Sequence, residues 1–291
     1  MKDTLRPISP YSWQSLQTRI TLLTLCVFVL SIGSLYGLLS RQLQDDVGQM
    51  LGEQQHATVA LHAREINRGQ AERMLTLEKV SQLFSPAMTG SRAELQLLMN
   101  ERPALPAMFN GGFFITDRQG SAIASIPLDA GRVGLHYLDR DHVASALLQG
   151  KSKVSKPAMG QALQVPVVSL GVPIRDAQGQ ILGALVGVID LDRPNFMDQI
   201  MSARYGKSGG YTLIAKEWRQ VVTATNKHRA LQHLPAVGIN PEVDRYLKDF
   251  AGPGLLADPL GIRVMASAAG IPGPICRCSR CRKPARTRLA S

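Results

Sequence analysis

The sequence predicts an α+β protein: a membrane-spanning helix, a long helix after it, and two similar halves made of hairpins and short helices. Three observations predict this fold class. An uncharged apolar run lies near the N-terminus, and apolar residues then keep a helical spacing as far as Pro86. From about residue 110 onward, short strands alternate with turn residues.

Length and charge limit the functions to consider. The chain has 291 residues, 45% of them apolar, which is enough for one or two ordinary domains. Its net charge of +11 would suit nucleic acid, but six of the Lys and Arg residues fall within residues 275–291. Residues 1–274 present no basic face studded with aromatic residues, so no nucleic-acid partner is predicted.

The apolar run fits a membrane anchor. Ile20 to Ser40 are 21 residues without a charge, and their helix would span roughly 30 Å, the thickness of the hydrocarbon core. The alternative is a cleaved signal peptide, but its apolar region would be about 7–15 residues long and would end in a small-x-small site. Because Lys2, Arg6 and Arg19 precede the run, the positive-inside rule keeps the N-terminus cytoplasmic and places the rest outside.

Residues 41–86 are predicted to form a long helix that stops at Pro86. Apolar residues recur along it at helical spacing: Leu43, Val47, Met50, Val59, Ala63, Ile66, Met74, Leu77, Val80 and Phe84. This stripe fits a helix packed on its own domain, a dimer seam, or both.

The first half is predicted to be a hairpin, a short helix and a second hairpin. "GFFITD" and "SAIASI" flank the turn Arg118–Gly120, and "RDHVASALLQG" forms the helix. "KVSKPAM" adds a strand before "VVSLGVPIRD" and "QILGALVGVIDL", which flank the turn Ala177–Gly179. The last of these strands is nearly all apolar, so we expect it at the centre of the sheet, covered on both faces.

The second half repeats the pattern. After the linking helix "RPNFMDQIMSAR", "GGYTLIA" and "QVVTAT" form a hairpin, "NPEVDRYLKDF" a helix, and "GLLADP" and "IRVMASA" a second hairpin. By analogy another apolar strand should follow. The sequence instead supplies a charged stretch with cysteines and Pro284, so we expect the second half to be incomplete.

No catalytic chemistry is predicted. "YGKSGG" resembles the end of a phosphate-binding loop, but Met201 stands where that motif needs its first glycine. The six histidines show no metal-binding spacing. The sequence therefore predicts no catalytic residue, no metal site and no cofactor.

Five stretches together resemble a known sensor family: "FFITDRQGSAIAS", "GLHYLDRDHVASALLQGKSKVSKP", "VPVVSLGVPIRDAQGQILGALVGVIDL", "GKSGGYTLIA" and "NPEVDRYLKDFAGPG". The chain resembles the double Cache (dCache) periplasmic sensor domain of bacterial transmembrane receptors, closest to those of diguanylate cyclases, over about residues 41–272. The resemblance implies two PAS-like antiparallel-sheet modules, a small-molecule ligand in the membrane-distal module, and a homodimer. In the family a second membrane helix leads to a cytoplasmic output domain, and neither is expected in this chain. With its one apolar span, the chain is therefore predicted to be a single-pass protein of the bacterial inner membrane with its sensor in the periplasm.

The residue patterns and the resemblance together predict the domain boundaries. They are a cytoplasmic N-terminus (1–19), a transmembrane helix (20–40), a long signalling and dimerisation helix (41–86), a membrane-distal Cache module (87–192), a truncated membrane-proximal Cache module (193–272) and an aberrant basic tail (273–291). Cys276, Cys278 and Cys281 in the tail give three of the four ligands that structural zinc needs. A shifted or truncated reading frame after about Pro272 explains the abrupt change of composition; an unusual tail on a genuine short sensor, and a metal or redox function, are the alternatives.

The family's amino-acid-binding pattern implies the ligand residues. In that pattern an Arg binds the ligand carboxylate and an Asp on the last strand binds its ammonium; Arg140 in "YLDRDHV" and Asp190 in "GVIDL" match these positions. Tyr137, His142 and Ser169 are expected to line the same pocket. The aromatic pair that follows the Arg in the family is missing here, so specificity for amino acids stays open. The alternative role of Arg140 is to tie a loop to Asp190 or Asp139.

The sequence thus predicts a non-catalytic, membrane-anchored periplasmic sensor for a small metabolite such as an amino acid or a carboxylate. One alternative is an N-terminal fragment of a diguanylate cyclase or sensor histidine kinase, whose catalytic signatures the chain does not contain. The other alternative is a dimerising membrane protein with an empty sensor fold.

Overall fold

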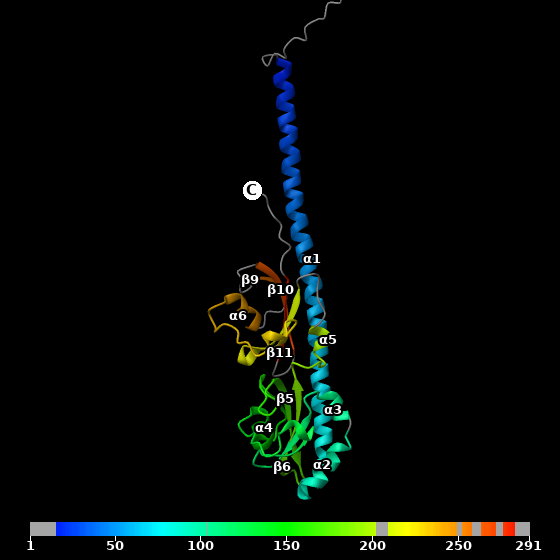
Figure 1. The fold of residues 1–291 in the computed structure, drawn as a ribbon. Helices are drawn as coiled ribbons and strands as arrows, with labels where there is room; N and C mark the ends of the chain where they lie inside the picture. Colours follow the sequence, from blue (N-terminus) through cyan, green and yellow to red (C-terminus); the bar gives the residue numbers. More distant parts are fainter. Residues whose placement is uncertain are drawn as a thin grey trace, which may run out of the picture. The chain divides into compact units, whose positions relative to one another are not determined.

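The fold is given by a computed structural model of the chain (Figure 1), which describes residues 16–102, 104–201, 209–248, 252–257, 263–271 and 276–282. Residues 1–51 and 52–291 form two compact units. Most of the expected cytoplasmic N-terminus and the ends of the expected tail, 273–275 and 283–291, lie outside the described residues.

The first unit consists of the N-terminal part of helix α1 (Leu16–Phe84), which has 69 residues in all. Its segment Arg19–Leu43 has a mean hydropathy of 2.2, and none of it is buried by the rest of the chain. By length and composition this segment can cross a membrane, and it contains the span predicted over residues 20–40.

The rest of α1 belongs to the second unit and ends at Phe84, and Pro86 opens a short 3₁₀ helix, Pro86–Thr89, as the sequence predicts. One stripe of α1 is fully buried in the core, namely Val59, Ala63, Ile66, Leu77 and Phe84. The helical spacing of the apolar residues therefore marks a packed face in this unit.

The first module packs two short helices and one antiparallel sheet beside α1. The helices are α2 (Arg92–Asn100), which begins at a capping box of Ser91 and Glu94, and α3 (Ala104–Met108). The strands are β1 (Phe113–Thr116), β2 (Ala122–Ile126), β3 (Lys153–Val154), β4 (Ala158–Met159), β5 (Pro166–Arg175) and β6 (Ile181–Asp190). Their order is β2-β1-β6-β5-β3, with β4 also paired to β5.

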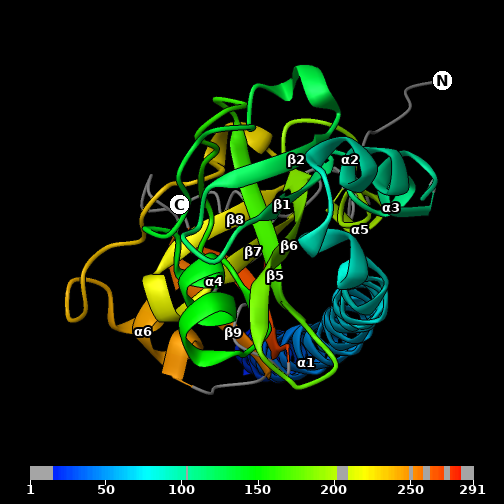
Figure 2. The ribbon, with the colours of Figure 1, turned by 90° about the horizontal axis from the view of Figure 1, so that it is seen from below.

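Strand β6 lies at the centre of this sheet and is covered on both faces, as its apolar sequence predicts. Leu185 and Ile189 pack with α1, α2 and α3 in one hydrophobic cluster. Val186 and Val188 pack in a second cluster with helix α4 (Asp141–Ala144). Figure 2 shows α1 to α3 on one side of the sheet and α4 on the other.

The two predicted hairpins of the first module turn by the same device. Asp117 Oδ1 accepts hydrogen bonds from the amides of Gln119 and Ser121, and Asp176 Oδ1 accepts from those of Gln178 and Gln180. Each turn ends in a glycine of positive φ, 88° at position 120 and 81° at position 179. The Asp-x-x-Gly spacing thus fixes both connections.

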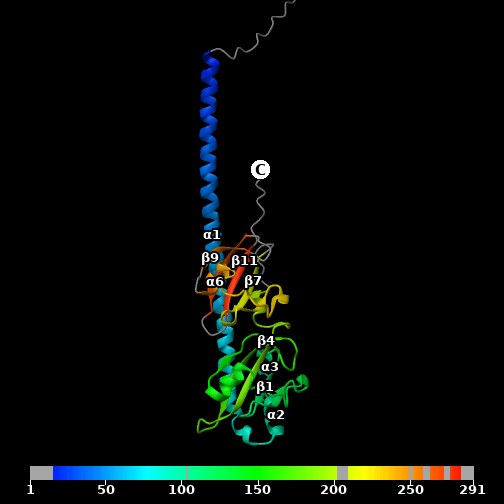
Figure 3. The same ribbon diagram turned by 90° about the vertical axis from the view of Figure 1, so that its left-hand side faces the viewer.

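The second module repeats the topology of the first. It contains α5 (Asp198–Met201) and α6 (Pro241–Lys248), with strands β7 (Gly210–Ala215), β8 (Gln220–Ala224), β9 (Gly252–Ala257), β10 (Arg263–Gly270) and β11 (Cys276–Arg282). Figure 3 labels α6, β7, β9 and β11 of this module. The order β8-β7-β11-β10-β9 matches β2-β1-β6-β5-β3 position by position. The prediction of an apolar N-terminal helix, a long helix after it and two antiparallel-sheet modules is confirmed.

One expectation about the second module is not met, because the sheet has its last strand. β11 pairs antiparallel with β7 and with β10 and so takes the place that β6 has in the first sheet. Part of the segment expected to be an aberrant tail is therefore a central strand. The physical reason is that β7 and β10 both need a partner for their backbone groups, and any residue except proline can supply one.

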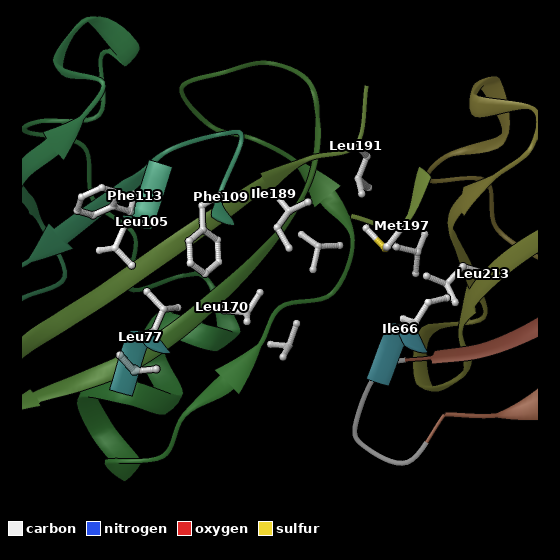
Figure 4. Close-up of a cluster of buried hydrophobic side chains, with 14 of the residues drawn as sticks. Ile66, Leu77, Leu105, Phe109, Phe113, Leu170, Ile189, Leu191, Met197 and Leu213 are labelled. Atoms are coloured by element: carbon white, nitrogen blue, oxygen red, sulfur yellow. The ribbon is translucent and has the colours of Figure 1, made fainter. Parts of the chain in front are cut away.

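The largest hydrophobic cluster joins α1 to both modules (Figure 4). At the first module's end of the cluster lie Leu77, Phe109 and Leu170. At the second module's end lie Ile66, Met197 and Leu213. Because one continuous core serves both sheets, residues 52–291 fold as one compact unit.

Candidate functional site

A cavity of about 320 Å³ lies on the α4 face of the first sheet. Its floor is formed by two aromatic residues, Phe114 and Tyr137, and by the strand residues Val167, Ser169 and Val188. The start of α4 and the segment 153–163 line the rest, and the second module adds two residues.

The structure brings four of the five predicted ligand residues together. Tyr137, Arg140, His142 and Ser169 all line the cavity, although Ser169 comes from β5, about 30 residues later in the chain. Asp190, at the end of β6, is not among the lining residues.

Helix α4 is held tightly against β5, and this contact positions His142. Gly171 on β5 permits it, because a Cβ at this position would lie 2.8 Å from the carbonyl oxygen of His142. The His142 side chain is buried, with its Nδ1 3.6 Å from Asp141 Oδ1, which is longer than a hydrogen bond. Burial lowers the pKa of His142, and neighbouring Asp141 offsets only part of this effect.

Arg140 caps the start of α4 with an extended backbone and extends its side chain into the cavity wall. Its Nε lies 3.4 Å from Asp139 Oδ2, and its Nη1 donates a weak hydrogen bond of 3.5 Å to the Met159 carbonyl. Nε itself makes no hydrogen bond to any described residue. Arg140 thus pairs with Asp139, one of the two acids of its alternative role, and its other contact is the Met159 carbonyl. It still has donors for a ligand.

Asp141 and Lys153 form a second ion pair at the cavity, 3.4 Å between Oδ2 and Nζ. Burial raises the pKa of the Asp141 carboxyl, but neighbouring His142 and Lys153 outweigh burial, so that its pKa lies below the ordinary value. Asp141 is therefore ionised at neutral pH and compensates the lysine charge.

Tyr137 contributes a ring and a hydroxyl. The ring stacks at a tilt on Phe114, with the centroids 4.6 Å apart. Burial raises the pKa of the Tyr137 hydroxyl, although Arg132 and Arg140 oppose the shift. The hydroxyl is therefore protonated at neutral pH and can both donate and accept hydrogen bonds.

Arg132 is a site residue that sequence reasoning missed. Its side chain is 2% exposed, lines the cavity, and lies 5.7 Å from the centroid of the Phe114 ring. It donates to Ser125 Oγ at 3.3 Å and to the backbone carbonyls of Ile126 and Gly111. Burial lowers its pKa, and no carboxylate of the described residues pairs with it. A loop arginine in "DAGRVG" carries no motif, so only the tertiary fold reveals it.

Asp190 stabilises the turn where the chain leaves the first module and does not line the cavity. Its carboxylate accepts hydrogen bonds from the amides of Asp192 at 2.9 Å and Arg193 at 3.3 Å, and the Arg193 Nε lies 3.5 Å from it. The side chain is only 4% exposed. These bonds cap the turn that follows β6.

Glu217 and Trp218 were also missed, because they belong to the other module. They lie in the 3₁₀ helix Lys216–Trp218 between β7 and β8, yet line the cavity of the first module. Nothing in their local sequence indicates a ligand site.

The charges of the cavity favour an anionic group. Its cations are Arg132, Arg140, Lys153 and Lys156, and its acids are Asp139, Asp141 and Glu217. Asp139 and Asp141 are paired with Arg140 and Lys153. The buried guanidinium of Arg132 has hydrogen-bond acceptors but no acid among the described residues, so its charge is not compensated and favours an anion in the cavity. Among the described residues, no group of three or more His, Cys, Asp or Glu side chains is placed to hold a metal.

Comparison with known proteins shows the fold. No protein-family model and no curated protein matches the sequence. Solved structures do match: the ligand-binding domain of the amino-acid chemoreceptor PctB of Pseudomonas aeruginosa in complex with L-Arg has a TM-score of 0.63 and 18% identity, over 85% of this chain and 99% of that one. The ligand-binding domain of the Pseudomonas fluorescens chemoreceptor CtaA in complex with L-serine has a TM-score of 0.58 and 18% identity, over 84% and 98%.

A third similar structure is a longer protein, the extracellular ligand binding receptor of Desulfohalobium retbaense, with a TM-score of 0.59 and 14% identity. This chain matches it over 78% of its own length and spans 40% of that receptor. The matched structures are an extracellular ligand-binding receptor and the ligand-binding domains of two chemoreceptors. Repeated sheets of the same strand order behind one long helix, together with these similarities, show that the chain has the fold of a double Cache sensor domain.

Proposed function

We propose that the chain is a membrane-anchored periplasmic sensor whose first module binds a small metabolite with a carboxylate group, an amino acid being the leading class. One observation carries the proposal: on a sensor fold, the cavity of about 320 Å³ gathers Arg132 and Arg140 beside the aromatic rings of Phe114 and Tyr137. Guanidinium groups bind carboxylates in a planar, two-bonded geometry, and rings cover the apolar part of a small ligand.

The proposed location in the membrane is supported by the apolar span and its flanking charges. The span Arg19–Leu43 and the basic residues before it support a single-pass protein of the inner membrane with the sensor outside. A homodimer is part of the proposal, because Leu61, Leu75 and Leu83 are exposed on one side of α1 at near-heptad spacing. Light scattering of the purified chain in detergent tests the dimer.

A further part of the proposal is that the sensor belongs to a diguanylate cyclase. The likeness to sensors of diguanylate cyclases rests on the order and spacing of the five sequence stretches quoted above. Reading the DNA on both sides of codon 272 and beyond codon 291 tests it: an open frame that encodes a cyclase supports the assignment, and one that encodes another output replaces it.

The ligand is tested by thermal unfolding of the full chain in detergent with the twenty standard L-amino acids, γ-aminobutyrate and small dicarboxylates. A ligand that binds only the folded state raises the melting temperature with its concentration. We expect at least one of these carboxylates to do so. If none raises the melting temperature at millimolar concentration, the empty-sensor alternative replaces the proposal.

A further inference from the structure

The cavity of the first module is completed by the second module. All its lining residues but two belong to residues 114–188; the exceptions are Glu217 and Trp218. These two stand on the 3₁₀ helix between β7 and β8, so the connection of one hairpin reaches the binding cavity of the neighbouring module.

The position of this 3₁₀ helix is fixed from its far side. Arg219, the next residue, takes a left-handed conformation with φ 48°, and its amide donates to the Lys216 carbonyl at 3.2 Å. The Arg219 guanidinium donates to the Pro235 carbonyl and pairs with Asp244 at 2.8 Å. Trp218 is partly buried and packs against the main hydrophobic core. The connection is therefore a built part of the cavity wall.

Glu217 differs from the other acids of the cavity. Asp139 and Asp141 each have a cation within 3.4 Å, whereas Glu217 forms no ion pair or hydrogen bond with any described residue. Its carboxylate is exposed and can accept hydrogen bonds from a ligand.

We propose that Glu217 and Trp218 are the second module's half of the ligand site. Glu217 accepts hydrogen bonds from a cationic group of the ligand, and Trp218 covers the ligand's apolar part, while the arginines of the first module bind its carboxylate. The inference rests on the proposed function and deepens it: the ligand class is a zwitterion that carries an ammonium group, and the bound ligand joins the two modules. Trp218 also supplies an aromatic surface where the family's aromatic pair after Arg140 is missing.

The test uses Trp218 itself as the probe. The sequence has two tryptophans, so Trp13→Phe in the full chain leaves Trp218 as the sole emitter. The chain in lipid nanodiscs is titrated with each standard L-amino acid and γ-aminobutyrate, and every compound that binds is then compared with its deaminated analogue, for example propionate for L-alanine. The variants are Glu217→Gln and, as a matched control, Glu101→Gln, an exposed glutamate away from the cavity.

We expect binding to change the emission of Trp218, and the amino compound to bind about tenfold to a hundredfold more tightly than its deaminated analogue, the range of a charge-assisted hydrogen bond. Glu217→Gln should remove most of this advantage and leave the affinity of the deaminated analogue unchanged; Glu101→Gln should keep it. Amide hydrogen exchange of residues 216–220 should slow when the amino compound is bound.

Two results overturn the inference and are distinct from each other. The first result is that compounds bind with an affinity that depends on Arg140, but Glu217→Gln leaves the ratio of amino to deaminated affinities unchanged, or amide exchange slows only within the first module. The proposed sensor function is then kept, and the role of the second module is rejected. If no compound binds, the proposed function falls and takes this inference with it.

Discussion

Asn110 forms two hydrogen bonds with the backbone of Asp190: its Nδ2 donates to the Asp190 carbonyl and its Oδ1 accepts from the Asp190 amide, each at 2.9 Å. Asn110 Nδ2 also donates to the Pro194 carbonyl at 3.0 Å. Together with the bonds of the Asp190 carboxylate to the amides of Asp192 and Arg193, they hold the end of β6 where the chain leaves the first module.

We therefore predict that Asp190 acts on stability more than on ligand affinity. Asp190→Ala removes the buried carboxylate that accepts from the partly buried amides of Asp192 and Arg193, and it should lower the free energy of unfolding by roughly 1–3 kcal/mol. Urea unfolding and calorimetric titration of the full chain measure the two effects, with the exposed Asp192→Ala as control. A variant that keeps its stability and loses its ligand would restore the ammonium-binding role that the family resemblance implies.

The stability of the chain should depend on His142 in mildly acidic solution. Burial holds the pKa of His142 below the ordinary 6.5. Between pH 6.5 and the lower folded-state pKa, the unfolded chain is therefore protonated at this residue and the folded chain is not. Stability is then level above pH 6.5 and falls as the pH falls from 6.5 toward the folded-state pKa. His142→Gln should flatten the decline between about pH 7 and pH 5 in urea unfolding, and the exposed His228→Gln should retain it.

Asp141 acts in a different pH window, so the two residues can be told apart. Its pKa is lowered from 3.8, and a carboxyl of depressed pKa contributes stability that is complete above 3.8 and lost as the pH falls further. If His142→Gln declines as steeply as the unchanged chain between about pH 7 and pH 5, another group causes the loss.

Strand β11 should contribute to stability. Ser279 pairs with Ala268 on β10 and Thr212 on β7, so Ser279→Pro removes a ladder hydrogen bond in a central strand, where proline is not tolerated. We expect the melting temperature to drop by at least several degrees, consistent with a loss of about 1–3 kcal/mol. Ser279→Thr, which keeps the backbone donor, is the control. If the proline variant and the unchanged chain have the same melting temperature, residues 276–282 add nothing to the fold, as expected of the tail from its sequence.

The orientation in the membrane can be tested with a reporter. Since Lys2, Arg6 and Arg19 precede the apolar span, alkaline phosphatase fused after residue 230 should be active, because it folds only in the periplasm. A fluorescent protein that folds only in the cytoplasm, fused at the same place, should stay dark. The reverse pattern would contradict the periplasmic sensor.

The sequence predicts those parts of the fold that local chemistry decides. The end of α1 before Pro86, the Asp-x-x-Gly turns and the central place of β6 each follow from residues close together in the chain. β11 was not predicted, because its charged sequence contains none of the β-branched or aromatic residues that favour strands, and what places it is the pairing required by β7 and β10.

The candidate site divides in the same way. Tyr137, Arg140 and His142 lie within one short stretch, and the resemblance to a family pattern finds them together. Arg132 and Trp218 enter the cavity from a loop and from the other module, and no spacing rule joins residues so far apart in the chain. Asp190 matches the family pattern in sequence, yet its carboxylate is taken up by backbone amides.

The central claim is that the first module binds a carboxylate through Arg140. It is tested most directly by calorimetric titration of the full chain with the strongest ligand from the melting experiment, in the unchanged protein, in Arg140→Ala and in the exposed control Arg92→Ala. Loss of a charge-assisted bond should weaken binding by about tenfold to a hundredfold in Arg140→Ala and leave Arg92→Ala unaffected. Equal affinity in all three proteins would contradict the claim and leave Arg140 the structural role it already has beside Asp139.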